Sequence, residues 1–188
     1  MPLNALVSFL IKKRLQQIQL FRDNPGMAQL EVFLALIQAA KYTEWGRKYH
    51  FASITNPDVF RSRVPLQDYN DLKPVVQRLR KGEQNITWPT DVRWFAKSSG
   101  TTNDRSKFIP VSREALEECH YKGGKDLIAF HYQQFPESNL YKGKSLVVGG
   151  SSNIERFRAD AYSGDLGAII IRNLPIWVEV RRTPVMET

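Results

Sequence analysis

Residues 98–107 combine hydroxyl, glycine and cationic side chains within one short segment, Ser98-Ser99-Gly100-Thr101-Thr102-Asn103-Asp104-Arg105-Ser106-Lys107. Its hydroxyls and backbone amides can donate hydrogen bonds to phosphate oxygens, and Lys107 with Arg105 adds positive charge. Gly100 allows the backbone to approach a ligand closely. These residue types predict a loop that binds the anionic oxygens of a phosphate group.

The segments on either side of this loop are short and apolar. Trp94-Phe95-Ala96 precedes it and Phe108-Ile109-Pro110-Val111 follows it. Runs of this type, bounded by turn-forming residues, are typical of strands. The sequence therefore predicts a hairpin-like connection in which two strands hold the polar loop.

The loop does not match the Walker pattern of P-loop nucleotide hydrolases. That pattern needs a glycine immediately before the lysine and a hydroxyl residue immediately after it. Lys107 instead lies between Ser106 and Phe108. A P-loop enzyme is disfavoured, and from composition alone an ordinary turn rich in Ser, Thr, Asn and Asp is an equal alternative.

Ser98-Ser99-Gly100-Thr101-Thr102 with Lys107 resembles the first signature of the adenylate-forming superfamily, which includes acyl-CoA synthetases and luciferases. More of the chain resembles the auxin-responsive Gretchen Hagen family of acyl acid amido synthetases, particularly its bacterial members. Besides Ser98 to Pro110, the resemblance rests on four motifs: Val64-Pro65-Leu66-Gln67-Asp68-Tyr69, Gly82-Glu83, Gly149-Gly150-Ser151 and Gly164-Asp165-Leu166.

The resemblance implies an ATP-dependent ligase that activates a small carboxylic acid as an acyl-adenylate and transfers it to an amino acid or another amine. It implies ATP and Mg²⁺ as cofactors, with Lys107 neutralising phosphate charge. The residues implied to hold the pyrophosphate portion of ATP are Ser98, Ser99, Gly100, Thr101 and Thr102. Asn103 and Asp104 stand where many superfamily members carry a further glycine.

The family's proteins are much longer than 188 residues. The superfamily's adenine-binding loop, ribose-binding acid, hinge and catalytic lysine are not identified in this sequence, so we assign no catalytic residue. We expect an N-terminal fragment of the adenylation fold that is a poor catalyst, or none, on its own.

Length and composition predict one globular lobe of mixed α/β class. A chain of 188 residues with 42% hydrophobic content can bury a sizeable core. We expect a partial N-terminal adenylation domain with a helical segment over residues 1–64 and a phosphate-loop-bearing α/β part over residues 65–188. A helical beginning followed by alternating strands and helices agrees with the N-terminal part of the adenylate-forming fold.

The cysteine and histidine residues indicate neither disulfides nor a metal centre. Cys119 is the single cysteine, which is typical of a reducing cytosol, and we expect a cytoplasmic protein. We interpret Cys119 as a half-buried helix thiol rather than a nucleophile. His50, His120 and His131 do not have the spacing of metal ligands, so no metal site built from protein ligands is expected.

The N-terminal apolar run Leu3–Leu10 is followed, rather than preceded, by basic residues, which disfavours a signal peptide. No segment approaches the 18 apolar residues of a membrane span. We interpret Leu3–Leu20 as an amphipathic helix, with binding to a membrane surface as the minor alternative, and expect no stable membrane association. Its predicted buried positions include Leu6, Leu10, Leu15 and Ile18.

Further helices are predicted from their start and stop signals. Asn24 and Pro25 begin a helix that continues to Ala40 and could form a hairpin with the first helix. Asn56-Pro57-Asp58 begins a short helix that ends near Arg61. Because Pro74 interrupts the next helical pattern, we expect a separate short helix over Val75–Lys81, closed by Gly82.

Beyond the loop, Ser112 predicts the cap of a long helix that ends near Phe135-Pro136. Its Gly123-Gly124 pair indicates either a kink with a close backbone contact or two tolerated glycines on an exposed face. Lys144 to Val148 predicts a buried strand, and the glycine loop after it is an order found at ligand edges of α/β sheets. Leu166–Ile171 is either a helix or a strand.

The formal net charge of +8 raises the possibility of nucleic-acid binding. The cations are scattered and lack the regular aromatic interleaving of a base-stacking surface, so we do not expect a nucleic-acid partner. An excess of cations also favours the electrostatic capture of ATP and a carboxylate. Two hypotheses therefore stand: part of an adenylate-forming ligase, and a non-catalytic phosphate-binding or interaction module.

Overall fold

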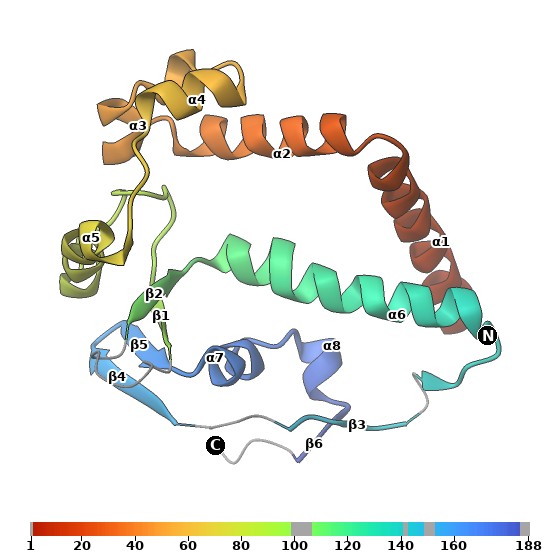
Figure 1. The fold of residues 1–188 in the computed structure, drawn as a ribbon. Helices are drawn as coiled ribbons and strands as arrows, with labels where there is room; N and C mark the ends of the chain where they lie inside the picture. The colour runs from red at the N-terminus through yellow and green to blue at the C-terminus, as the bar shows by residue number, and fades with distance from the viewer. Residues whose placement is uncertain (1, 99–106, 141–142, 149–152, 185–188) are drawn as a thin grey trace. The chain divides into compact units, whose positions relative to one another are not determined.

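The computed structural model describes residues 2–98, 107–140, 143–148 and 153–184 and has a mixed α/β architecture (Figure 1). Two compact units are present. The helical unit comprises Met1–Asp91 with Lys122–Gln134, and the sheet unit comprises Val92–Tyr121 with Phe135–Thr188. The expected fold class, with a helical N-terminus followed by strands and helices, is confirmed. The division into residues 1–64 and 65–188 follows motifs rather than contacts and stays a prediction.

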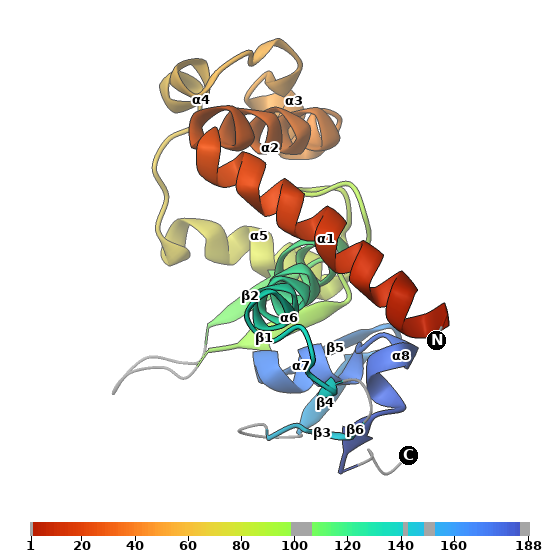
Figure 2. The same cartoon turned by 90° about the vertical axis from the view of Figure 1, so that its right-hand side faces the viewer.

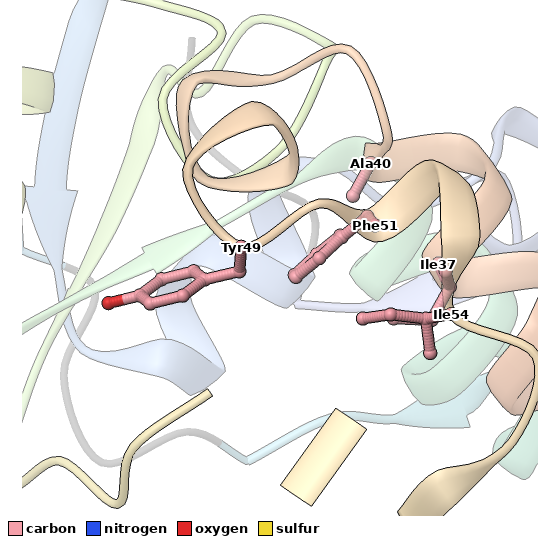
Figure 3. Packing of buried hydrophobic residues seen from close by; sticks show 5 residues of the cluster. All are labelled: Ile37, Ala40, Tyr49, Phe51 and Ile54. Carbon is pink, nitrogen blue, oxygen red and sulfur yellow. The ribbon is translucent and has the colours of Figure 1, made fainter. Parts of the chain in front are cut away.

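The helical unit has a compact core where α2 meets the short helices after it (Figure 3). Its elements are α1 (Pro2–Asp23), α2 (Pro25–Ala40), α3 (Glu44–Lys48), the 3-10 helix η1 (Phe51–Ser53), α4 (Pro57–Arg63), α5 (Tyr69–Lys81) and α6 (Lys122–Gln134). The buried core residues are Ile37, Ala40, Tyr49, Phe51 and Ile54. Phe33 extends this core to α4 through an edge-on contact with Phe60, with ring centroids 5.6 Å apart.

The first two helices form where predicted, but they do not pair with each other as a hairpin. Figures 1 and 2 show α1 and α2 meeting at an angle. Helix α1 packs on α6 instead, where Arg14 makes a two-pronged ion pair with Asp126 that includes an Nη2 to Oδ2 distance of 2.8 Å. Leu10 is exposed, so its predicted burial is wrong, whereas Leu15 and Ile18 are half-buried.

Capping residues explain the boundaries of the next helices. Asn56 accepts hydrogen bonds from the backbone amides of residues 58 and 59 and begins α4 as predicted. At α2 the prediction is only half right, because Pro25 occupies the first turn but the Asn24 side chain makes no capping bond. The helix predicted from Val75 begins six residues earlier, at Tyr69, and contains Pro74.

The early start of α5 has a local cause. The Asp68 side chain accepts hydrogen bonds from the backbone amides of Asn70 and Asp71, and the Asp71 side chain accepts one from the Asp68 amide. This reciprocal capping box stabilises the first turn. Gly82, at a φ of 109°, ends the helix in the left-handed conformation, as predicted.

The sheet unit contains a four-stranded sheet in the order β2-β1-β5-β4 and a separate two-stranded sheet of β3 and β6. Its strands are β1 (Trp94–Lys97), β2 (Phe108–Val111), β3 (Ser145–Leu146), β4 (Ile154–Arg158), β5 (Ala161–Gly164) and β6 (Arg182–Thr183). Its helical elements are the π-helical segment η2 (Ala115–Tyr121), α7 (Leu166–Arg172) and α8 (Ile176–Glu179).

Both faces of the central strand β1 are covered. Ala96 on one face belongs to a buried cluster that includes Leu116 of η2 and Ile169 of α7. Phe95 points to the other face, is fully buried, and contacts Phe157 of β4 with ring centroids 5.6 Å apart. This burial on both sides fixes the strand from which the candidate loop emerges.

The long helix after the loop is confirmed, with a feature that the sequence did not predict. Ser112 accepts a hydrogen bond from the Ala115 amide at 3.1 Å and caps the helix. Residues 115–121 are π-helical, ahead of Gly123 and Gly124. Side chains at these exposed glycines would meet nothing within 4 Å, which favours two tolerated glycines over a close backbone contact. Cys119 is exposed, so its predicted half-burial is wrong.

The strand predicted over residues 144–148 is short and exposed rather than buried. Only Ser145–Leu146 form β3, which pairs with β6 in parallel, and Leu146 and Val148 are 72% and 83% exposed. The apolar run over 166–171, for which two states were open, is the helix α7. Asn173 is its C-cap residue.

Candidate functional site

The base of the candidate loop is an antiparallel hairpin, as predicted. Strand β1 pairs with β2 so that Trp94 lies opposite Val111 and Lys97 opposite Phe108. One step further, the Ser98 amide donates a hydrogen bond to the Lys107 carbonyl at 2.9 Å. The two predicted site residues at the ends of the loop are therefore direct neighbours across the hairpin.

Of the six predicted phosphate-binding residues, the structure describes the two at the base of the loop. Ser98 is half-buried and Lys107 is exposed. The other four, Ser99, Gly100, Thr101 and Thr102, lie outside the described residues.

Side chains alternate between the faces of a strand, so Ser98 and Lys107 continue the row that contains Ala96 and Ile109. This is the sheet face on which η2 and α7 pack through Leu116 and Ile169. The side chains of Ser98 and Lys107 thus leave their strands on the face that η2 and α7 cover, rather than on the face of Phe95.

A second glycine motif ends at the same edge of the sheet. Strand β5 runs parallel to β1, and its last residue, Gly164, lies opposite Ala96. The carboxyl ends of β1 and β5 therefore lie side by side, with the candidate loop after one strand and Asp165 after the other. In α/β sheets ligands bind outside the carboxyl ends of the strands.

A third motif adjoins this edge through β4. Strand β4 is antiparallel to β5, and its first residue, Ile154, lies opposite Gly164. Asn153 precedes it, and the motif residues Gly149, Gly150 and Ser151, just before Asn153 in the chain, lie outside the described residues. The start of β4 is thereby at the edge where β5 ends.

Gly164 is required by a close approach of two backbones at this edge. A Cβ atom on Gly164 would lie 2.7 Å from the Asn153 carbonyl oxygen and 3.3 Å from a side-chain carbon of Ile154. No residue with a side chain fits without moving β4. The glycine in the Gly164-Asp165-Leu166 motif thus holds β4 and β5 together at the candidate site.

Asp165, the next residue of that motif, has a structural role in the described residues. Its carboxylate accepts a hydrogen bond from the Gly167 amide at 2.8 Å and caps α7. The cap fixes where α7 begins after β5. Asp165 therefore sets the path of the chain away from the sheet edge.

Tyr121 is a residue beside the site that the sequence reasoning did not select. Its hydroxyl donates a hydrogen bond to the Ile170 carbonyl of α7 at 3.0 Å. Burial, and secondarily the charge of Glu117, raises the pKa of Tyr121 to about 12. The signal that could have found it is its spacing of five residues from Leu116, which matches a π-helical turn.

The two remaining family motifs stabilise α5 in the helical unit. Arg78 of α5 makes paired hydrogen bonds to Glu44, at 2.8 and 2.6 Å, and a third to Glu83 at 2.8 Å. The Arg78 guanidinium holds the pKa of the Glu44 carboxyl below its usual value. Asp68 caps the start of α5 and Gly82 ends it. The motifs at residues 64–69 and 82–83 therefore stabilise the fold of the helical unit.

None of the helices in the described residues is long and apolar enough to cross a membrane.

Comparisons with known proteins agree on one family. The family model described as the GH3 family N-terminal domain matches residues 14–188. The chain is 26% identical over 163 residues to jasmonoyl-L-amino acid synthetase JAR6 of Nicotiana attenuata, covering 86% of this chain and 27% of the relative. It is 29% identical over 106 residues to indole-3-acetic acid-amido synthetase GH3.2 of Arabidopsis thaliana, covering 56% and 19%.

The fold itself is also similar to that of a solved structure. The structure matches a GH3.15 acyl acid amido synthetase with a TM-score of 0.66 at 18% identity, covering 90% of this chain and 29% of the other. The chain thus spans roughly a quarter of the length of the proteins it matches. Because the family model accounts for nearly all of the sequence, the chain belongs to the GH3 family, of which it carries the N-terminal domain.

Proposed function

We propose that this chain is the phosphate-binding N-terminal portion of an acyl acid amido synthetase. The full-length protein would activate a small carboxylic acid with ATP and transfer the acyl group to an amino acid or another amine. The names of its relatives, jasmonoyl-L-amino acid synthetase and indole-3-acetic acid-amido synthetase, describe such products. The resemblance to bacterial members and the cytoplasmic location remain predictions from the sequence.

The observation that carries this proposal is that the strand ends adjoining three sequence-distant motifs meet at one sheet edge. The described residues that adjoin them are Ser98 and Lys107, Asn153, and Gly164. A glycine-rich, hydroxyl-rich edge beyond the carboxyl ends of parallel strands is suited to a nucleotide, because backbone amides and hydroxyls can approach the phosphates closely.

We propose that the loop holds the terminal phosphates of ATP through six residues: Ser98, Ser99, Gly100, Thr101, Thr102 and Lys107. The donor chemistry of these residues suits a polyanion, because it combines hydroxyl donors with one ammonium group. The Ser98 amide is already bonded to the Lys107 carbonyl, so Ser98 would contribute its hydroxyl rather than its amide. Lys107 would neutralise charge on the departing pyrophosphate.

The proposed reaction has two steps. A carboxylate oxygen attacks the α-phosphorus of ATP, and the bond to the β-phosphate oxygen breaks to release pyrophosphate. An amine nitrogen then attacks the acyl carbon, loses a proton and displaces AMP. Mg²⁺, when bound, would offset the negative charge of the phosphates. The chain's own residues bind and orient the phosphates in the first step.

The test is carboxylate-dependent exchange of pyrophosphate into ATP by the full-length protein, screened over a panel of carboxylic acids. Ser99→Ala and Lys107→Ala should reduce the exchange at least tenfold, because each removes a phosphate donor. Lys125→Ala is the matched control, since Lys125 is an exposed cation on α6 in the helical unit. Unchanged exchange in both loop variants would refute the assigned roles.

The alternative is a phosphate-binding or interaction module without catalysis. It needs only the donor groups at the base of the loop, the Ser98 hydroxyl and the Lys107 ammonium group, which suit phosphate binding without a catalytic residue. Under this alternative ATP binds, and Lys107→Ala weakens that binding, but no carboxylate in the panel supports exchange. Measuring ATP affinity beside exchange therefore separates the two functions.

A further inference from the structure

The helix after β2 departs from α-helical geometry over Ala115–Tyr121, directly beside the candidate site. π-helical turns are rare and are found often at functional sites, because they cost stability and need a compensating gain.

The π-helical turn brings Leu116 and Tyr121 onto the same face. Residues five apart point in different directions in an α-helix, where neighbours on a face are three or four apart. In a π-helix the hydrogen bonds run from i to i+5 and each turn is wider, so residues five apart lie on the same side of the helix. Leu116 is buried in the cluster with Ala96 and Ile169, and Tyr121 packs against the same cluster.

The Tyr121 hydroxyl then reaches the end of α7. Its 3.0 Å hydrogen bond goes to the Ile170 carbonyl, which belongs to the last turn of the helix. Carbonyls in a last turn have no partner within the α-helical ladder, so an outside donor ties the helix end in place. The Asn173 amide also approaches this carbonyl, at 3.2 Å.

The hydrogen bond from Tyr121 to Ile170 joins the two elements that cover the loop-bearing face of the sheet. One is η2, which follows β2, and the other is α7, which follows Gly164 and Asp165. Both contribute to the buried cluster that contains Ala96, the residue two before Ser98. A change in the spacing of these elements would therefore alter the base of the candidate loop.

We propose that Tyr121 is a positioning residue for ATP binding, which acts by holding η2 and α7 together over the base of the 98–107 loop. This inference rests on the proposed function. Burial is the main cause that raises the pKa of Tyr121 to about 12, which agrees with a hydroxyl that is partly enclosed beside α7. Tyr121 itself need not touch the nucleotide.

The test compares Tyr121→Phe with the parent in the full-length protein, with Tyr42→Phe as the matched control. Tyr42 lies in the helical unit and is 68% exposed. Phenylalanine keeps the ring and removes only the hydroxyl. The Kd for Mg·ATP, and the KM for ATP in exchange, should rise about five-fold, which corresponds to about 1 kcal/mol. The kcat should stay within about two-fold, because no group that contacts the reacting atoms is removed.

A merely structural role gives a different result. Loss of folded protein lowers kcat per total protein and leaves KM and Kd unchanged, and that outcome would overturn the inference. A Tyr121→Phe variant whose Kd, KM and kcat all equal those of the parent would overturn it as well. If the parent binds ATP but shows no exchange with any carboxylate, the ligase function fails while the Kd comparison still decides the role of Tyr121. If the parent binds no ATP, both proposals fail.

Discussion

Gly164→Ala should destabilise the sheet unit and open the edge at which the candidate motifs meet. The added methyl carbon would lie 2.7 Å from the Asn153 carbonyl oxygen, well inside the 3.4 Å at which ordinary contact begins. The obstacle is backbone, which cannot rotate away as the end of a flexible side chain can. Strand β4 must therefore shift away from β5.

The size of the effect follows from two opposing contributions. Overpacking of this kind costs about 1–3 kcal/mol. Replacing glycine by alanine also restricts the unfolded chain, which stabilises the folded state by about 0.4–1 kcal/mol. We therefore expect a net loss of about 1–2 kcal/mol in the free energy of unfolding. With a urea dependence near 2 kcal/mol/M, the midpoint should fall by about 0.5–1 M.

The assay is urea unfolding followed by circular dichroism, with Gly124→Ala as the matched control. A Cβ atom on Gly124 meets nothing within 4 Å, and Gly124 lies in helix α6. The same substitution there should raise the free energy of unfolding by about 0.5–1 kcal/mol, because alanine is the better helix former. If Gly164→Ala raised the midpoint as the control does, the close approach of β4 and β5 would be refuted, and the shared edge with it.

Two further predictions concern caps and pH. Asn56→Ala should lower the free energy of unfolding by about 1 kcal/mol, because it removes the cap of α4. Asn24→Ala should leave it nearly unchanged, since Asn24 makes no capping bond, and equal urea midpoints for the two variants would contradict this. Because the pKa of Tyr121 rises from 10.0 to about 12, its stabilising contribution is complete below pH 10 and is lost as pH rises toward 12. The difference in urea midpoint between the parent and Tyr121→Phe should therefore shrink over that interval, and a constant difference would refute the assignment.

Local signals predicted much of the fold. The apolar flanks gave the β1–β2 hairpin, and Ser112, Asn56 and Gly82 marked helix boundaries where the structure has them. Each of these signals acts over a few residues, so the local sequence is enough to predict the hairpin and the helix boundaries. The predicted helix break at Pro74 is wrong, because the capping box formed by Asp68 and Asp71 stabilises a helix that starts before the proline.

The structural features that the sequence did not predict depend on contacts between residues far apart in the chain. The parallel pairing of β1 with β5 joins residues 94–96 to 162–164, and nothing local specifies it. The π-helical segment is another case, because its register is fixed by the packing of Leu116 and Tyr121 on a cluster that includes Ile169. Tertiary packing thus decided the parts of the candidate site that lie between the sequence motifs.

The family motifs divide into two physical groups, and this division sharpens where chemistry is to be sought. Asp68 and the Gly82-Glu83 pair cap or brace α5 through hydrogen bonds within the helical unit. Gly164 instead lies where β1 and β5 end together, beside the base of the hydroxyl-rich loop. A motif match alone does not separate these roles. Substitution of Asp68, Gly82 or Glu83 should change stability without altering the ATP affinity of the folded protein. Substitution at the sheet edge should change both stability and ATP affinity, because the same backbone contacts shape the fold and the proposed phosphate site.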